Sequence, residues 1–274
     1  MKVDAFARRH AVVTYFVLAF AISWVGCIVV AGPKCVRSQS MQLADGLLVF
    51  LVMLLGASSS AVALTAYLDG RDGLRELFFR MKEWRVGARW YFAPVVFPVL
   101  IVLVVLALSV LVSGEFALAF APLGIAVGLM AGFFEEIGWT GYALPRMLGK
   151  RSALAAAVCL GLLHTSWHLM ADFLIASGTR GVYWLPHFAA FVVSMTAMRV
   201  FVVWVYANTR SVLLAQLMHA SSTGFLAVLV PLSLSPASDT LFYATYGVVL
   251  WVAVATIVAV FGKNLVGRKE VEAT

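Results

Sequence analysis

The sequence has little charge for its length. Of its 274 residues, 20 are Lys or Arg and 13 are Asp or Glu, so charged side chains make up 12% of the chain. A soluble domain has roughly twice that share. Hydrophobic residues make up 63% instead, and the mean hydropathy is +0.97. This composition excludes an ordinary water-soluble domain and predicts a polytopic membrane protein, with residues 1–274 forming a single membrane domain.

Cysteine is scarce as well. Cys27, Cys35 and Cys159 have neither metal-ligand spacing nor the pattern of a disulfide framework. No internal repeat or low-complexity segment is present. The net charge of +7 does not indicate nucleic-acid binding, because a basic excess in a membrane protein reflects its cytoplasmic loops and anionic lipids. We therefore expect the lipid bilayer as a partner and no nucleic acid.

Long apolar runs are abundant, and eight of them are long enough to cross a bilayer. The first follows a basic start but is longer than the apolar region of a signal peptide, and no clear cleavage site follows it. We expect it to be a retained span. The link between the sixth and seventh runs is very short and predicts a tight hairpin. The predicted spans are 11–31, 43–67, 91–113, 119–144, 153–177, 183–207, 211–232 and 241–262.

The basic residues predict the orientation of these spans. With the N-terminus inside, 16 of the 20 Lys and Arg residues lie in cytoplasmic segments and three in outer loops. Such a split follows the positive-inside rule and predicts that both termini are cytoplasmic. Within the second cytoplasmic segment, "DGRDGLRELFFRMKEWRVGARW" (69–90) places apolar residues at helical spacing between basic ones. This pattern predicts an amphipathic interfacial helix that anchors the protein or presents substrate.

Only a few ionisable side chains fall deep inside the predicted spans. They lie on four spans, and their depths, counted at 1.5 Å per helical residue, place most of them in the cytoplasmic half. Ionisable groups inside a membrane indicate a functional site whose members neutralise one another. They are Glu135, Glu136, His164, His168, Arg199 and His219. Asp172 shares a helix face with His168 and either orients that imidazole or is an unrelated acid at the outer rim.

Four interpretations of this constellation are open from the residues alone. A carboxylate can activate water for hydrolysis while histidines assist and other donors hold the oxyanion. His164 and His168 have the i, i+4 spacing of a zinc site, although the residues between them are "TSW". Glu and His can also form the relay of a proton- or ion-coupled transporter. Finally, the cluster can be a scaffold that only ties helices together.

Three motifs in order resemble those of a known family. "EEIGWTGYALPRM", "GLLHTSWHLM" and "NTRSVLLAQLMHASST" are similar to the successive motifs of the CAAX-protease and bacteriocin-processing (CPBP, or Abi) proteins, which include the type II CAAX prenyl endopeptidases. The similar region is about 131–225. The resemblance implies an intramembrane glutamic endopeptidase with no cofactor and no metal.

The resemblance also implies a role for each matching residue. Glu135 would be the general base, Glu136 the supporting carboxylate, His168 a helper in water activation and His219 an oxyanion donor. His164 stands where the family often has an aromatic residue. Two positions depart from the family pattern, because Thr140 replaces a usual arginine and Thr223 a usual asparagine. A threonine hydroxyl can donate a hydrogen bond to an oxyanion but cannot supply a guanidinium charge.

The missing arginine leads to a specific structural prediction. Two adjacent carboxyl groups at membrane depth need a cation or a shared proton, and a bare arginine at that depth is costly too. We therefore predict that Arg199 pairs with Glu136, with Arg146 as the alternative partner. Arg199 could instead extend toward the cytoplasmic surface.

These observations predict an all-α protein of about eight transmembrane helices, located as a multi-pass protein in the cell membrane. Its predicted function is hydrolysis of a peptide bond near the cytoplasmic membrane surface by glutamate-activated water. The expected partner is a peptide or protein substrate that carries a lipid in some family precedents. The alternative function is a non-catalytic membrane scaffold or immunity protein of the same fold.

Overall fold

The computed structural model describes residues 2–36 and 41–267, which fold into helices without any β-strand in these ranges. Most helices are long, as apolar segments must be to cross a bilayer while satisfying their backbone hydrogen bonds. The α-helices are α1 (Lys2–Arg9), α2 (Ala11–Val36), α3 (Leu43–Met81), α4 (Val96–Leu111), α5 (Leu123–Gly138), α6 (Leu144–Leu148), α7 (Ala153–Arg180), α8 (Trp184–Thr209), α9 (Val212–Leu229) and α10 (Pro236–Phe261).

Seven helical segments among the described residues are long and apolar enough to span a membrane. The longest, Ala153–Thr209, has 57 residues. At 1.5 Å per residue a single helix of that length would far exceed a hydrocarbon core of about 30 Å. It contains α7 and α8, which are joined by the short 3-10 turn Gly181–Tyr183 and pack against each other. The structure therefore agrees with the prediction of about eight spanning helices, while the cytoplasmic location of both termini stays a prediction.

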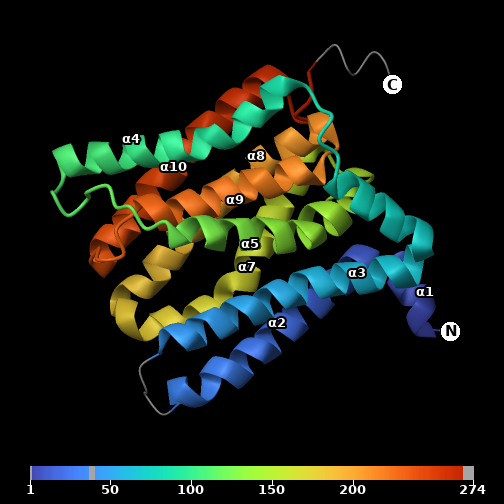
Figure 1. Ribbon diagram of the computed structural model, residues 1–274, viewed down its shortest axis with the longest axis horizontal. Helices are drawn as coiled ribbons and strands as arrows, with labels where there is room; N and C mark the ends of the chain where they lie inside the picture. The colour runs from blue at the N-terminus through green and yellow to red at the C-terminus, as the bar shows by residue number, and fades with distance from the viewer. Residues whose placement is uncertain (1, 37–40, 268–274) are drawn as a thin grey trace.

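The helices form one elongated bundle (Figure 1). In this view α2 and α3 lie on one side, α4 and α10 on the other, and α5 and α9 run between them. The N-terminus and the last described residues lie at one end of the bundle, which we call the basic end because it also carries the segment 69–90. The connections α7–α8 and α9–α10 lie at the opposite end, which we call the far end.

The predicted hairpin between the sixth and seventh spans is confirmed. α8 ends at Thr209, and α9 begins at Val212. Arg210 adopts a left-handed conformation with φ of 56°, which turns the chain sharply. The side chain of Ser211 then accepts a hydrogen bond from the backbone N–H of Leu214 and caps α9. This hairpin places Arg199 on α8 and His219 on α9 in adjacent helices.

Helices α5 and α9 approach each other closely because small residues face each other along both. Gly128 and Gly132 lie on α5 one turn apart, and a Cβ built on Gly132 would stand 2.4 Å from the backbone oxygen of Gln216. A Cβ on Gly128 would stand 2.4 Å from the backbone oxygen of Ala220. Small residues at such spacing allow membrane helices to touch backbone to backbone. The close approach was not among the predictions, although its signal is present in "GIAVGLMAG" (124–132), where glycine recurs every four residues.

The predicted amphipathic helix is shorter than 69–90. Gly70 leaves helical geometry with φ of 67° and ψ of −155°, so α3 bends there and the helix resumes over 71–81. Leu77 and Met81 are buried, whereas Phe78 and Phe79 are exposed. After Met81 the chain is irregular until the 3-10 turn Ala88–Val95. The prediction was wrong at the C-terminal boundary, because residues 82–87 leave the helix before the pattern of apolar residues ends.

Candidate active site

Glu135 and Glu136 occupy the last turn of α5, where the chain changes its helical pitch. The next five residues, Trp139–Ala143, form a π-helical turn before α6. Such turns insert one extra residue into a helix. Four residues after Gly141, Pro145 has no N–H that could donate to the Gly141 oxygen. Here the carbonyl oxygen of Gly141 accepts a hydrogen bond of 2.9 Å from Arg80. A leucine, Leu77, fills the space above Gly141, where a Cβ would stand 2.6 Å from its Cδ1.

The carboxylate of Glu136 is fully buried and has a partner on three sides. Arg199 donates from Nη1 to Oε2 over 2.8 Å, and the Thr140 hydroxyl donates to the same oxygen. Nδ1 of His219 lies 2.7 Å from Oε1. The predicted pair between Arg199 and Glu136 is therefore confirmed. Because its charge is balanced and both its oxygens are occupied, Glu136 is suited to orient neighbours rather than to accept a proton.

Arg146, the alternative partner, does not reach the carboxylates. Its guanidinium pairs with Asp69 and lies 3.8 Å from the centre of the Tyr142 ring. It also donates to the backbone oxygen of Tyr142 over 2.9 Å. Arg146 thus lies away from the carboxylates, because its side chain leaves the π-helical turn toward Asp69, next to the bend in α3. Its supporting role stays a prediction.

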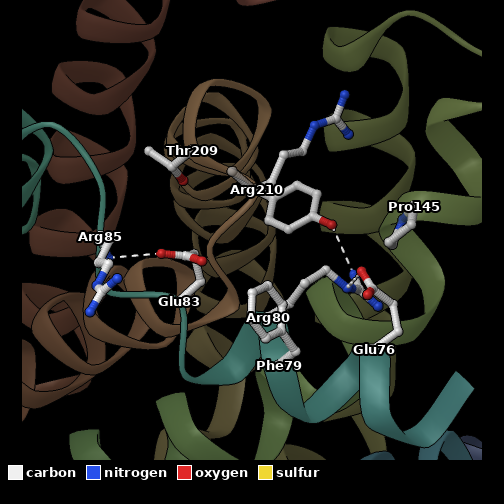
Figure 2. A pocket seen from close by; sticks show the side chains of 9 residues that line it. Glu76, Phe79, Arg80, Glu83, Arg85, Pro145, Thr209 and Arg210 are labelled. Carbon is white, nitrogen blue, oxygen red and sulfur yellow. Dashed lines mark hydrogen bonds and ion pairs between the residues drawn. The ribbon is translucent and has the colours of Figure 1, made fainter. Parts of the chain in front are cut away.

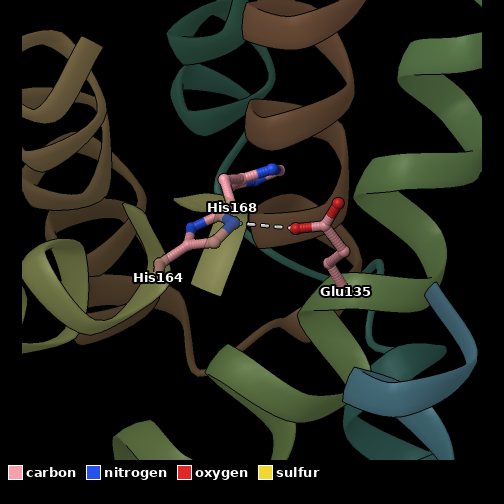
Figure 3. A group of neighbouring side chains, drawn as sticks. All are labelled: Glu135, His164 and His168. Carbon is pink, nitrogen blue, oxygen red and sulfur yellow. Dashed lines mark hydrogen bonds and ion pairs between the residues drawn. The ribbon is translucent and has the colours of Figure 1, made fainter. Parts of the chain in front are cut away.

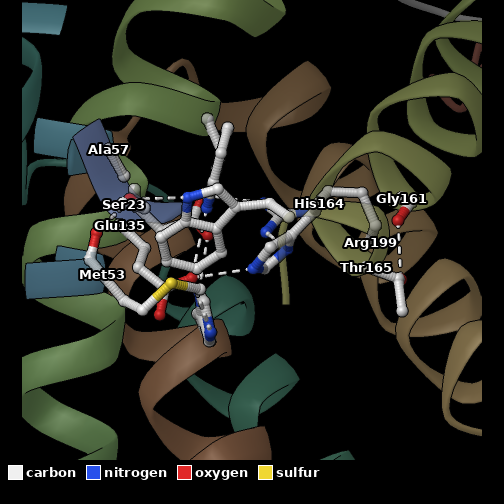
Figure 4. Close-up of polar contacts among 12 residues, drawn as sticks. Ser23, Met53, Ala57, Glu135, Gly161, His164, Thr165 and Arg199 are labelled. Atoms are coloured by element: carbon white, nitrogen blue, oxygen red, sulfur yellow. Dashed lines mark hydrogen bonds and ion pairs between the residues drawn. The ribbon is translucent and has the colours of Figure 1, made fainter. Parts of the chain in front are cut away.

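Glu135 is also buried, but only one of its oxygens is used. Nε2 of His164 lies 2.7 Å from Oε2, and the Trp139 indole N–H donates to the same oxygen over 3.2 Å. No hydrogen bond among the described residues uses Oε1. Figure 4 shows Glu135, His164 and Arg199 gathered at the centre of this polar group. The carboxylate is held from one side and has one oxygen available on the other.

A cavity of about 410 Å³ reaches Glu135 from the far end of the bundle. His168, His219 and Thr223 line it together with Glu135. Nε2 of His219 lies 4.0 Å from Oε2 of Glu135, so the two groups face the same space. His168 is partly exposed there and makes no hydrogen bond to any described residue. Four of the predicted site residues, from three helices, thus meet at one cavity.

The mouth of this cavity lies at the far end, between the α7–α8 and α9–α10 connections. Arg180, Leu232 and Asp239 line it there. Asp172 bonds Arg180 and Trp184 rather than His168, so it is the acid of the outer rim. At the basic end, a separate hollow of about 520 Å³ is lined by Arg80 and Tyr206 among others, but by neither Glu135 nor Glu136 (Figure 2). Glu135 is therefore open to one end of the bundle and closed toward the other.

Depth counted from the helix ends predicted a site in the cytoplasmic half of the membrane. Glu135 lies near the middle of the stretch from Leu123 to Leu148. Counting along a helix does not tell which end the packing closes. Trp139, Tyr142 and Leu144 are completely buried and separate the carboxylates from the basic end. If the basic end is cytoplasmic, the cavity opens toward the outer side of the membrane.

Glu135, His164 and His168 could also be considered as metal ligands, since one donor atom of each lies within 4.8 Å of the others (Figure 3). A metal would take Nε2 of His164, and Nδ1 would then carry the proton and need an acceptor. The group facing Nδ1 at 2.8 Å is the Arg199 guanidinium, which can only donate. A cation there would also be repelled by that positive charge. The residues present therefore do not fit a metal ion.

Tryptophans that the sequence analysis did not consider hold α7 in place. The Trp167 indole donates to the Ser23 hydroxyl over 2.9 Å, and the Trp24 indole donates to the backbone oxygen of Trp167 over 2.9 Å. These contacts join α2 to α7 beside His164 and His168. Their signal in the sequence is the pair of tryptophans inside two apolar runs, where an indole N–H needs a partner.

Comparisons with known proteins found similarity to CAAX prenyl proteases. Residues 99–225 match the family described as "Type II CAAX prenyl endopeptidase Rce1-like". The CAAX prenyl protease 2 of Methanococcus maripaludis is 30% identical over 152 residues, which are 53% of this chain and 53% of that protein. The chain thus spans about half the length of this curated relative. The matched region contains all three sequence motifs, and both comparisons support assignment of the chain to the CPBP family as an Rce1-like protein.

Proposed function

We propose that this protein is an intramembrane endopeptidase that hydrolyses a peptide bond with water activated by Glu135. The single observation that carries the proposal is the state of the Glu135 carboxylate. One oxygen is fixed by His164 and Trp139, and the carboxylate lines a cavity that His168, His219 and Thr223 also line. A general base needs this combination of fixed orientation and access to water.

The reaction follows from the donors and acceptors around that cavity. Glu135 takes a proton from a water that His168 helps to position, and the oxygen of this water attacks the carbonyl carbon of the peptide bond. Glu135 then delivers the proton to the leaving nitrogen as the C–N bond breaks. No atom other than those of water and peptide is gained or lost. Glu135 is therefore a carboxylate at the start of the reaction and a carboxylate again at its end.

The oxyanion that forms during attack needs donors on the cavity wall. His219 donates its Nδ1–H to the carboxylate of Glu136, so a neutral His219 has a bare Nε2 on the cavity side. It presents an Nε2–H to the cavity when both of its ring nitrogens carry a proton. The Thr223 hydroxyl, one helical turn further along α9, is the second donor. Thr223 can thus fill the role of the asparagine that is usual in the family.

A non-catalytic scaffold remains the alternative function, and the Thr140 and Thr223 departures are its basis. The Thr140 departure is the weaker basis for a scaffold, because Arg199 brings a guanidinium to Glu136 from another helix. Incubation of the purified protein in nanodiscs with a peptide library tests the choice. The library should contain unmodified and prenylated C-terminal tails, and mass spectrometry should identify cleavage products. Absence of any product would favour the scaffold.

The side from which substrate enters depends on membrane orientation, which an accessibility experiment can determine. In a variant without its native cysteines, Leu232→Cys lies at the cavity mouth, where Leu232 is 92% exposed, and Lys150→Cys lies at the basic end. The positive-inside distribution predicts that an impermeant maleimide added to intact cells labels the first and not the second. Labelling of Lys150→Cys alone would reverse the orientation and place the mouth on the cytoplasmic side.

Chelation should leave the activity unchanged. Because Arg199 prevents His164 from serving as a metal ligand, dialysis against a strong chelator is expected to keep the peptide cleavage rate within about twofold of the untreated rate. The measurement is the initial rate before and after dialysis, with elemental analysis of the protein. If the activity is lost and stoichiometric zinc restores it, the metal interpretation is correct and Arg199 does not prevent metal binding.

A further inference from the structure

Arg199 connects the two glutamates through His164. The arginine is on α8 and is completely buried. Its Nη1 donates to Glu136 over 2.8 Å, and its Nη2 lies 2.8 Å from Nδ1 of His164. The other ring nitrogen of His164, Nε2, lies 2.7 Å from Glu135. A continuous chain of polar contacts therefore runs from Glu136 through Arg199 and His164 to Glu135.

The direction of each hydrogen bond in this chain follows from chemistry. A guanidinium has donors and no acceptor, so Nδ1 of His164 must accept and cannot carry a proton. The single proton of the neutral ring is then on Nε2, and Nε2–H donates to Oε2 of Glu135. The contact with Glu135 alone does not determine this tautomer, because a protonated Glu135 could donate to an Nε2 that carries no proton.

The packing leaves the ring no alternative. His164 is completely buried, and its ring centre lies 5.1 Å from that of Trp139 and 5.2 Å from that of His168. A ring flip would place Cδ2–H where Nδ1 now faces the guanidinium and would remove the acceptor that Arg199 needs. A buried donor without an acceptor is strongly disfavoured. The arrangement of Arg199 thus fixes both the orientation and the tautomer of His164.

We propose that Arg199 holds His164 in the Nε2–H tautomer and that the pair positions Glu135 for catalysis by occupying Oε2 and directing Oε1 to the cavity. This inference rests on the proposed function and adds two positioning residues to it. His164 does not exchange a proton with the substrate. Its contribution is a fixed donor, which occupies Oε2 of the carboxylate and leaves Oε1 to accept a proton.

The tautomer can be measured without any substrate. Nitrogen-15 NMR of histidine-labelled protein in nanodiscs distinguishes the two neutral tautomers and the imidazolium. The signals of His164 are those lost in His164→Phe, and His10→Gln, a change at a histidine far from the site, is the matched control. We expect His164 to be the pure Nε2–H tautomer at neutral pH. An Nδ1–H tautomer or an imidazolium would overturn the proposal, whether or not the protein cleaves peptides.

Two substitutions of His164 separate positioning from proton transfer. Glutamine keeps one acceptor for Arg199 and one N–H donor for Glu135, but it cannot be protonated at neutral pH. Phenylalanine keeps the ring and loses both. We expect kcat to fall about tenfold or more in His164→Phe with little change in KM, and His164→Gln to recover most of that loss. If His164→Gln folds and is as inactive as His164→Phe, the positioning role is wrong.

Arg199→Lys tests the two-armed contact. Lysine keeps the positive charge but offers one nitrogen, which cannot serve Glu136 and His164 with the geometry of a guanidinium. We expect a mixture of His164 tautomers in the NMR spectrum and a decrease in kcat of about tenfold. A pure Nε2–H signal together with wild-type kcat in Arg199→Lys would show that the guanidinium does not set the tautomer. Absence of cleavage by the wild type would reject the proposed function and leave the NMR result to decide the tautomer.

Discussion

Glu135→Gln is expected to lower the rate of peptide cleavage about 10²- to 10⁴-fold, the share that a general base contributes to catalysis. The amide oxygen can still accept hydrogen bonds from His164 and Trp139, which both reach Oε2 in the wild type. It cannot accept the proton of the attacking water. The loss should therefore appear in the initial rate of product formation, and the thermal unfolding temperature should stay close to that of the wild type.

The neighbouring carboxylate provides the matched control. Glu136→Gln removes the negative charge beside Arg199 and leaves a buried guanidinium without its ion-pair partner. Breaking a buried pair in this way typically destabilises a protein by about 3–5 kcal/mol. Glu136→Gln should thus lower the unfolding temperature clearly, in contrast to Glu135→Gln. Full cleavage activity in Glu135→Gln would mean that another group is the base.

Gly132→Ala is expected to reduce activity strongly although it adds only one methyl group far from the cavity mouth. The new Cβ would stand 2.4 Å from the backbone oxygen of Gln216 and 2.8 Å from the backbone nitrogen of Ala220. Because these are backbone atoms, α9 itself must move away from α5. His219 belongs to that part of α9, and its 2.7 Å contact with Glu136 would lengthen. A displacement of about 1 Å in a catalytic group can lower the rate by about 10²-fold.

The measurement for Gly132→Ala combines cleavage rate and unfolding temperature. Overpacking of a close contact typically destabilises by about 1–3 kcal/mol, so the fold should persist while the rate falls. Gly46→Ala in α3 is the control, since a Cβ on Gly46 meets nothing within 4 Å. That variant should keep both the rate and the stability. Wild-type activity in Gly132→Ala would imply that the close approach of α5 and α9 does not control the position of His219.

The spans could be predicted from the sequence because lipid demands long apolar helices whatever their neighbours are. The Arg199–Glu136 pair could be predicted too, since each buried charge needed a partner and both had a similar depth. Depth along a helix does not, however, tell which way a side chain points around the helix axis. It could not show that Arg146 turns toward Asp69 or that the cavity opens at the far end. It also gave no reason to place His164 against Glu135, where the structure has its shortest contact with that carboxylate.

The π-helical turn at Trp139–Ala143 determines which way the residues beyond it face. On an uninterrupted helix, Arg146 would stand eleven positions after Glu135, which is almost three full turns and therefore nearly the same side. The extra residue rotates everything beyond it by about 100°. A single deletion within 139–143 would restore a regular helix while keeping both glutamates. It would leave Arg146 ten positions after Glu135 on a regular helix, which is about the angle that it has now, so its side chain would still face Asp69. A helical-wheel comparison of this segment with a homologue is thus valid only for each half taken separately.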